Sequence, residues 1–269
     1  MAFAGQGSLL APGFTVTIIV AVYLSCTMNA YLASERQRRQ ARAAFGQYRA
    51  PAQIERLAAN PELLSLGGDM REVTILFCYI RGFTSMSESL SAQELTQLVN
   101  RFLTAMSGAI LDFGGTIDKY IGDCVMAFWK APLDNPAHAR QACKAALSMR
   151  VRLRQLNEEL LAEAANGAPS IGTIKMGVGI NTGQCCVGNM GSEQRFNYSV
   201  LGDNVNLAAR FEEETKSFGV DLVIGENTRR QVPDLEAYEL GRITVGGRNQ
   251  PVRVFTLPED GSRDHGSPI

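Results

Sequence analysis

The sequence predicts an α+β domain in which long helices cover an antiparallel-rich β-sheet. Residues 73–80 form an unbroken apolar run bounded by charges, which is typical of a strand buried on both faces. Residues 91–113 and 137–161 carry apolar side chains at helical spacing. Short apolar segments on either side of glycine-containing turns predict hairpins. Strands that alternate in this way with long helices predict helices packed on a sheet.

The other elements of the domain follow from the same patterns, in chain order. Gly67-Gly68 opens the domain, which we expect to span residues 67–257. After the first strand and helix we expect a hairpin (116–120 and 124–129), the second helix, a strand pair around Thr182-Gly183 (174–181 and 185–187), a helix (204–216) and three strands (222–224, 238–240 and 252–257). Residues 258–269 are polar and are predicted to form a disordered tail.

The N-terminal part of the chain predicts a membrane anchor. No charged residue precedes Glu35, and residues 14–33, after a short segment at 1–13, are mostly apolar. About 20 helical residues rise about 30 Å, the hydrocarbon thickness of a bilayer. Arginines directly after this run favour a cytoplasmic domain on a single-pass protein of the plasma or inner membrane, and argue against a signal peptide. The alternative is a buried helix that ends a missing upstream domain.

Residues 34–66 are basic and Ala-rich with a helical pattern, so they predict a helical connector, either a signal transmitter or a plain solvated spacer.

Charge, cysteine and histidine content argue against several other classes of protein. The net charge of −1 gives no indication of nucleic-acid binding. The 6 cysteines include no CxxC pair and the 2 histidines lie far apart. Reduced thiols in a cytosolic domain are therefore expected, rather than zinc or disulfides.

Three segments combine residue types that suit phosphoryl transfer. In residues 80–84 (IRGFT) a buried strand ends in a glycine turn that opens a helix, which leaves backbone N–H groups free for phosphates. Residues 118–123 (DKYIGD) place a carboxylate at a hairpin tip, near a lysine. Residues 197–210 (NYSVLGDNVNLAAR) place Asn206 and Arg210 on one helix face. Phosphoryl transfer needs these groups, whereas the chain has no P-loop and no complete dinucleotide fingerprint.

These segments, with their surroundings, resemble the class III adenylyl/guanylyl cyclase homology domain. The similar stretches are VTILF, IRGFTSMSE, GGTIDKYIGDCVMAFW, GVGINTGQCCVGNMGSEQRFNYSVLGDNVNLAAR and ITVGGRNQPVRVF, which together cover about residues 71–257. Upstream, FGQYRAP and ELLSLGG resemble bacterial cyclases whose catalytic domain follows a transmembrane sensor. The resemblance implies a ferredoxin-like fold and a head-to-tail dimer, either a homodimer or a heterodimer. It also implies conversion of ATP to cyclic AMP and pyrophosphate at sites built from both chains.

The resemblance also assigns roles to residues. In that family two aspartates of one chain hold two divalent ions, Mg²⁺ or Mn²⁺, which activate the ribose 3′-hydroxyl and stabilise the departing pyrophosphate. Asp123 matches the second aspartate, and the Ile80 backbone lies at a further ligand position. From the other chain, Asn206 matches the residue that orients the ribose and Arg210 the cation that stabilises the transition state. The segment whose backbone touches the triphosphate is matched by Gly82, Phe83 and Thr84.

Two further positions of the resemblance concern the base. Adenylyl members have a lysine where Lys119 stands and Asp, Thr or Ser where Ser199 stands, whereas guanylyl members typically have Glu at the first position. A lysine only donates hydrogen bonds and adenine N1 only accepts them. We therefore expect ATP as the substrate.

The chain departs from the family pattern at the first metal-binding aspartate, where Tyr79 stands. A neutral phenol with a pKa of about 10 cannot replace a carboxylate between two Mg²⁺ ions, which prefer charged oxygens. In a homodimer both sites would carry this defect. A smaller departure is Gly246, where relatives often have a lysine that contacts phosphate; Arg248 is expected to compensate.

Three functions therefore remain open from the sequence. The first is an adenylate cyclase whose homodimer is impaired by Tyr79. The second is an inactive partner that completes the site of an intact cyclase chain. The third is a membrane-anchored nucleotide sensor that performs no chemistry.

Overall fold

The computed structural model describes residues 16–29, 67–167, 171–192, 194–244 and 251–258. The chain divides into two units, Met1–Glu55 and Arg56–Ile269. In the first unit residues 16–29 form an exposed helix, in which Thr27 Oγ1 donates to the Tyr23 carbonyl at 2.8 Å. None of the helices within the described ranges is long and apolar enough to cross a bilayer. The predicted span at 14–33 extends beyond the described helix at both ends, and the connector at 34–66 lies outside the described residues.

The second unit is an α+β domain built on a mixed, mainly antiparallel sheet, as the sequence predicts. The strands run in the order β2-β3-β1-β4-β6-β8-β7, and β5 pairs with β4 off this path. Strand β4 pairs with β6 in parallel, and the other described pairings are antiparallel. The strands are β1 (Gly67–Ile80), β2 (Thr116–Ile121), β3 (Cys124–Trp129), β4 (Met176–Ser192), β5 (Arg195–Leu201), β6 (Leu222–Gly225), β7 (Tyr238–Ile243) and β8 (Val252–Thr256).

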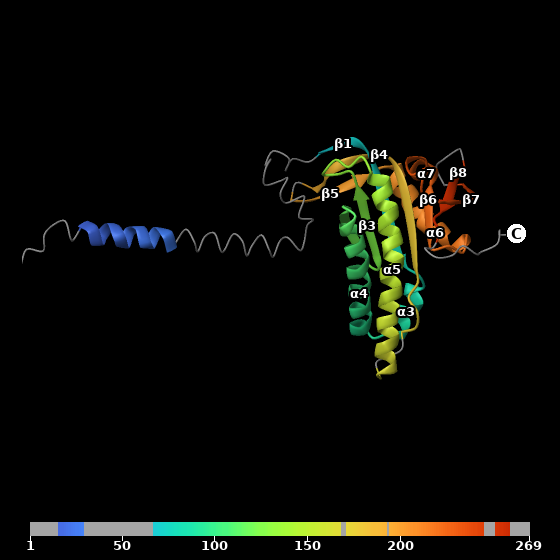
Figure 1. Ribbon diagram of the computed structural model, residues 1–269, viewed down its shortest axis with the longest axis horizontal. Helices are drawn as coiled ribbons and strands as arrows, with labels where there is room; N and C mark the ends of the chain where they lie inside the picture. Colours follow the sequence, from blue (N-terminus) through green and yellow to red (C-terminus); the bar gives the residue numbers. More distant parts are fainter. Residues whose placement is uncertain (1–15, 30–66, 168–170, 193, 245–250, 259–269) are drawn as a thin grey trace, which may run out of the picture. The chain divides into compact units, whose positions relative to one another are not determined.

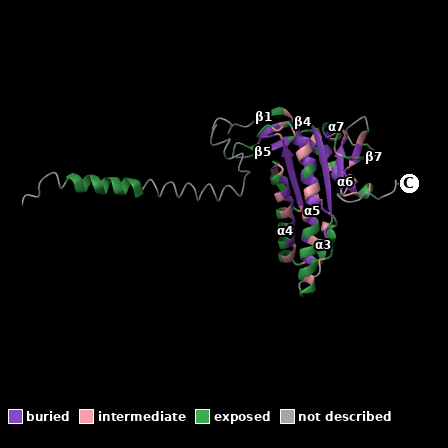
Figure 2. Cartoon of the chain, in the orientation of Figure 1, coloured by how far each residue is buried: buried purple, intermediate pink, exposed green. Residues whose placement is uncertain are grey.

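Helices cover both faces of this sheet, which leaves its central strands as the buried layer in Figures 1 and 2, whereas β2 and β7 are largely exposed or half-buried. The helices are α3 (Phe83–Ser89), α4 (Ala92–Asp112), α5 (His138–Ala165), α6 (Asp203–Ser217) and α7 (Glu226–Gln231). Side chains of β1 alternate between the faces because a strand has a period of two. Leu76 and Cys78 pack with α4 and α5, whereas Ile75 and Phe77 pack in the cluster that contains α6 residues.

The helix predicted at 91–113 is α4, and a capping box fixes its first turn. The Ser91 side chain accepts from the Glu94 backbone N–H, and the Glu94 carboxylate accepts from the Ser91 backbone N–H at 2.9 Å. This reciprocal pair satisfies two N–H groups that have no partner within the helix. It also separates α4 from the short helix α3.

The strand pair predicted at 174–181 and 185–187 is wrong, because β4 runs through the supposed turn without interruption. It pairs with β1 from Gly67 opposite Asn189 to Ile80 opposite Met176. Gly183 is not a turn residue: a Cβ there would overlap the Asn204 side chain of α6. The glycine therefore permits a close approach of helix to strand. The chain reverses after β4 and returns as β5, a strand that the hydrophobic pattern does not predict.

The predicted hairpin of β2 and β3 is confirmed, with a turn at Gly122, whose φ is 61°. Its register shifts between Ile117, opposite Ala127, and Lys119, opposite Met126. Asp118 is the additional residue of this β-bulge. A bulge bends its strand and re-aims side chains.

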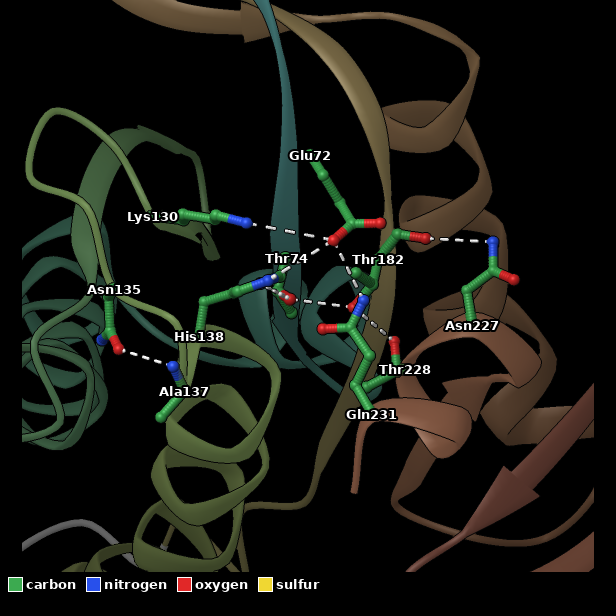
Figure 3. Close-up of polar contacts among 10 residues, drawn as sticks. All are labelled: Glu72, Thr74, Lys130, Asn135, Ala137, His138, Thr182, Asn227, Thr228 and Gln231. Carbon is green, nitrogen blue, oxygen red and sulfur yellow. Dashed lines mark hydrogen bonds and ion pairs between the residues drawn. The ribbon is translucent and has the colours of Figure 1, made fainter. Parts of the chain in front are cut away.

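A buried polar network joins β1, β4, α5 and α7 (Figure 3). The Thr74 hydroxyl lies 2.7 Å from His138 Nδ1 and 2.8 Å from the Thr182 hydroxyl, which is 2.9 Å from that of Thr228. Glu72 lies 3.8 Å from His138 Nε2. All four members of the hydroxyl–imidazole chain are buried, so their hydrogen bonds offset the cost of removing them from water.

Candidate active site

The end of β1 and the β2–β3 turn bring Ile80 and Asp123 together. The Ile80 backbone N–H donates to Asp123 Oδ2 at 3.2 Å. Asp123 is half-buried, and burial raises the pKa of its carboxyl group while the backbone hydrogen bonds lower it. This position therefore holds a carboxylate with one oxygen fixed by the backbone of the neighbouring strand.

Tyr79 fills the position beside this carboxylate. Its ring packs against the apolar cluster that includes Cys124, and besides burial the Cys124 thiol is among the groups that raise the pKa of its hydroxyl. Burial raises the pKa of the Tyr79 hydroxyl above its ordinary value, so the group is neutral at physiological pH. The described residues contain no group of three or more His, Cys, Asp or Glu side chains able to hold a metal ion. With a neutral phenol at position 79, Tyr79, Ile80 and Asp123 present a single side-chain carboxylate, which does not fit a two-ion site.

A second carboxyl group, Glu212 of α6, lies on the same side of the sheet and was missed by the sequence analysis. Its carboxyl oxygen packs on Gly177, which is the β4 partner of Tyr79. Glu212 is 5% exposed, and burial raises its pKa to about 6, against the opposing effects of Lys216 and Arg81. A signal was available in the sequence, because a glutamate at this spacing falls on the apolar face of the helix.

The segment that is predicted to contact the triphosphate, Gly82 to Thr84, follows shortly after β1. Gly82 has a φ of 70° and precedes α3, and a Cβ at this position would meet no atom within 4 Å. Gly82 and Thr84 are exposed, whereas Phe83 packs against the core. The backbone at Gly82 is therefore open to solvent.

The two predicted base-recognition residues meet through a third residue, Asp118. The Ser199 hydroxyl of β5 donates to Asp118 Oδ2 at 2.8 Å, and Lys119 Nζ lies 3.5 Å from the same oxygen. The Asp118 side chain is 0% exposed, whereas that of Lys119 is 47% exposed. Burial raises the pKa of Asp118, and the hydrogen bond from Ser199 and the charge of Lys119 oppose this shift. Asp118 belongs to the motif around Lys119, but its contact with Ser199 depends on the bulge, which the sequence does not reveal.

Asn206 and Arg210 project from α6 away from the core of their own chain. Both are exposed, while Leu207 and Phe211 of the same helix are buried. Arg210 pairs with Glu213 of its own helix at 2.6 Å. The two predicted catalytic side chains are thus accessible to a second molecule. The predicted contact residue Arg248 lies outside the described residues.

The glycine turn, the hairpin carboxylate and the base-recognition pair lie on one helix-covered sheet, as expected for a class III cyclase homology domain. The chain belongs to the adenylate and guanylate cyclase catalytic domain family, which matches residues 68–258.

Relatives with both substrate names are similar to this chain. The adenylate cyclase of Anabaena cylindrica is 35% identical over 191 residues, which are 70% of this chain and 37% of that protein. The structure of this chain is similar to that of the adenylyl cyclase CyaB from P. aeruginosa. The two are 34% identical, with a TM-score of 0.63, and the match covers 75% of this chain and 100% of CyaB. The guanylyl cyclase Cya2 also has a TM-score of 0.63, with 31% identity and coverage of 73% and 98%. Overall similarity therefore does not select the base.

Proposed function

We propose that this chain is an ATP-directed cyclase domain whose homodimer turns over slowly because Tyr79 stands at a metal-binding position. The observation that supports the choice of ATP is the Lys119–Asp118–Ser199 group, which holds a hydrogen-bond donor for adenine N1 next to a serine hydroxyl. The observation that supports slow turnover is the neutral Tyr79 ring, which packs against the apolar cluster that includes Cys124 at the position of the expected carboxylate.

The reaction is an intramolecular displacement at phosphorus. The ribose 3′-oxygen loses its proton and bonds to the α-phosphorus, and the bond from that phosphorus to the pyrophosphate oxygen breaks. In this proposal Lys119 orients the base, Asn206 orients the ribose, and Arg210 stabilises the charge that develops on the phosphate oxygens. Because Asn206 and Arg210 are exposed on α6, they would act in a site completed by a second chain.

The second candidate function is that of an inactive partner. Lys119, Ser199, Asn206 and Arg210 are all present, and this half of the site does not require a carboxylate at position 79. A chain of this kind would complete the site of a partner that keeps both aspartates. A nucleotide sensor without turnover would use the same groups.

The deciding experiment compares cyclic AMP formation from Mn²⁺-ATP by the wild-type chain, Tyr79→Asp and Tyr79→Asn. Both substitutions remove the ring, but only aspartate restores a charged ligand. We expect Tyr79→Asp to raise the rate about 1000-fold or more, since each 1.4 kcal/mol of transition-state stabilisation is worth about tenfold. Tyr79→Asn should stay near the wild-type rate. Equal rates for all three folded proteins would refute the assignment of Tyr79.

We further propose that residues 14–33 anchor the chain in the plasma or inner membrane, with the cyclase domain in the cytoplasm. The uncharged apolar run and the arginines that follow it support this. The test is alkaline carbonate extraction of membranes from cells that express the full chain or a variant without residues 1–33. Release of the full chain into the soluble fraction would contradict the proposal.

A further inference from the structure

We propose that Asp118 is a specificity-determining residue, which makes Ser199 a hydrogen-bond acceptor toward the 6-position of the purine and so selects adenine over guanine. This inference rests on the proposed function, because it assumes that a purine nucleotide binds beside Lys119 and Ser199. Asp118 itself would act through Ser199, as a positioning residue that does not touch the base.

The hydrogen bond to Asp118 fixes the direction in which the hydroxyl proton of Ser199 points. Its hydroxyl donates to Asp118 Oδ2 at 2.8 Å, and the side chain of that aspartate is 0% exposed. A serine hydroxyl has one proton and two lone pairs, and a hydrogen bond to a carboxylate is stronger than one to a neutral acceptor. Once the proton points at Asp118, Ser199 presents only lone pairs to a ligand.

The purine 6-position distinguishes between these two states of the hydroxyl. Adenine has a 6-amino group, which donates, whereas guanine has a 6-oxo group, which accepts. A Ser199 that only accepts is complementary to adenine and faces an unpaired acceptor in guanine. Serine alone would not discriminate, because a free hydroxyl can rotate to serve either base.

Two observations separate this role from a purely structural one. First, Asp118 is the additional residue of the β2 bulge, and bulges commonly re-aim a side chain near a functional site. Second, Asp118 Oδ1 is buried and has no hydrogen-bond partner among the described residues. A buried carboxylate kept only for stability would be expected to have both oxygens paired. The same residue also holds Lys119 Nζ at 3.5 Å, next to the serine that it orients.

The test is the ratio of kcat/KM for ATP to that for GTP in the Tyr79→Asp background, with and without Asp118→Asn. Asparagine is the same size, but its amide can donate to Ser199 and thereby free the serine proton for guanine O6. We expect the ATP/GTP ratio to fall at least about 10-fold. Asp112→Asn is the matched control, because Asp112 is an exposed residue of α4 that pairs with Arg152, and it should leave the ratio unchanged.

A double-mutant cycle removes the contribution of general damage to the fold. In a Ser199→Ala background there is no hydroxyl to orient, so adding Asp118→Asn should not change the ratio further. Competition of ATP and GTP against a fluorescent ATP analogue on the wild-type chain gives the same ratio without turnover. The inference would be overturned if Asp118→Asn weakened the use of ATP and of GTP in equal proportion. It would also be overturned if Asp118→Asn changed the ATP/GTP ratio equally with and without the Ser199 hydroxyl.

The Lys119→Glu variant distinguishes a failure of the Asp118 inference from a failure of the proposed function. If ATP is preferred and Lys119→Glu erodes the preference while Asp118→Asn does not, only the role of Asp118 is refuted. If the wild-type chain binds neither nucleotide and the Tyr79→Asp chain forms no cyclic nucleotide, the proposed function fails, and the role of Asp118 fails with it.

Discussion

At the scale of single residues, Tyr79→Asp places a negative charge where the fold now holds a neutral ring. Asp123 and Glu212 already have raised pKa values from burial, so a third carboxyl group nearby adds repulsion. The tyrosine relieves this repulsion and fills the space beside Cys124. We therefore expect the metal-free chain to be more stable with tyrosine than with aspartate at position 79.

This leads to a prediction for metal binding. Tyr79→Asp should unfold at a lower temperature than the wild-type chain in EDTA, and Mn²⁺ should raise its Tm by more than it raises that of wild type, because a ligand that binds only the folded state stabilises it. Differential scanning fluorimetry over a Mn²⁺ series measures both effects. Tyr79→Asn serves as the uncharged control. A Mn²⁺ response equal to that of wild type would contradict the prediction.

His138 gives a second residue-scale prediction, for the dependence of stability on pH. It is 1% exposed, and burial and the charge of Lys130 lower its pKa, against the opposing effects of Glu72 and Asp134. Its position as the first residue of α5 also disfavours a positive charge. Below the unfolded pKa of about 6.5 the unfolded chain binds the proton more readily, so the free energy of unfolding should fall as the pH drops and should be nearly constant above it.

Urea unfolding at pH 7.5 and pH 5.5 measures this slope. His138→Gln keeps a polar side chain without a titrating group, so the variant should lose part of the pH dependence. His265→Gln, which changes the chain's other histidine, is the control and should leave the slope unchanged. If His138→Gln and wild type show the same slope, the buried imidazole does not titrate as described.

At the scale of elements, the contact of α6 with β4 depends on glycine. A Cβ at Gly179 would overlap the backbone of Ala208 and Glu212, which cannot move without shifting the helix. A Cβ at Gly108 of α4 would meet only the end of the Arg152 side chain, which can rotate away. We therefore expect Gly179→Ala to cost about 2 kcal/mol or more of unfolding free energy, and Gly108→Ala to be near neutral or stabilising. Chemical denaturation of the two variants checks the contrast, and equal effects would disprove it.

The same elements explain what the sequence could and could not predict. The periodic segments predicted α4, α5, α6 and the β2–β3 hairpin because each has a strong local pattern. The glycine at 183 was misinterpreted as a turn, since the helix that requires it lies elsewhere in the chain. The candidate site residues were assigned by resemblance at motif positions, and their roles remain predictions. Asp118 and Glu212 were missed because their contacts depend on a bulge and on helix packing, which are set by tertiary structure.

At the scale of the whole molecule, the proposed shared site predicts complementation between chains. The wild-type chain lacks the carboxylate at 79 but keeps Arg210, whereas a Tyr79→Asp/Arg210→Ala variant has the carboxylate but lacks the α6 cation. A heterodimer would contain one composite site with every group and one with both defects. Mixing equal amounts should yield more cyclic AMP than the sum of the parents, in proportion to the heterodimer fraction. A purified heterodimer no more active than its parents would show that the sites are not shared.

The uninterrupted pairing of β1 also limits how a mechanical input could reach the site. Strand β1 extends from Gly67 to Ile80, about 45 Å of nearly inextensible backbone, and is paired with β4 along that whole length. Sliding it by one residue would turn every buried side chain to the wrong face, so register slip is not an available motion. A pull or twist applied at Gly67 is therefore expected to move β1 together with β4 rather than to slide one strand along the other, and Ile80, which is hydrogen-bonded to Asp123, lies at the far end of that pair.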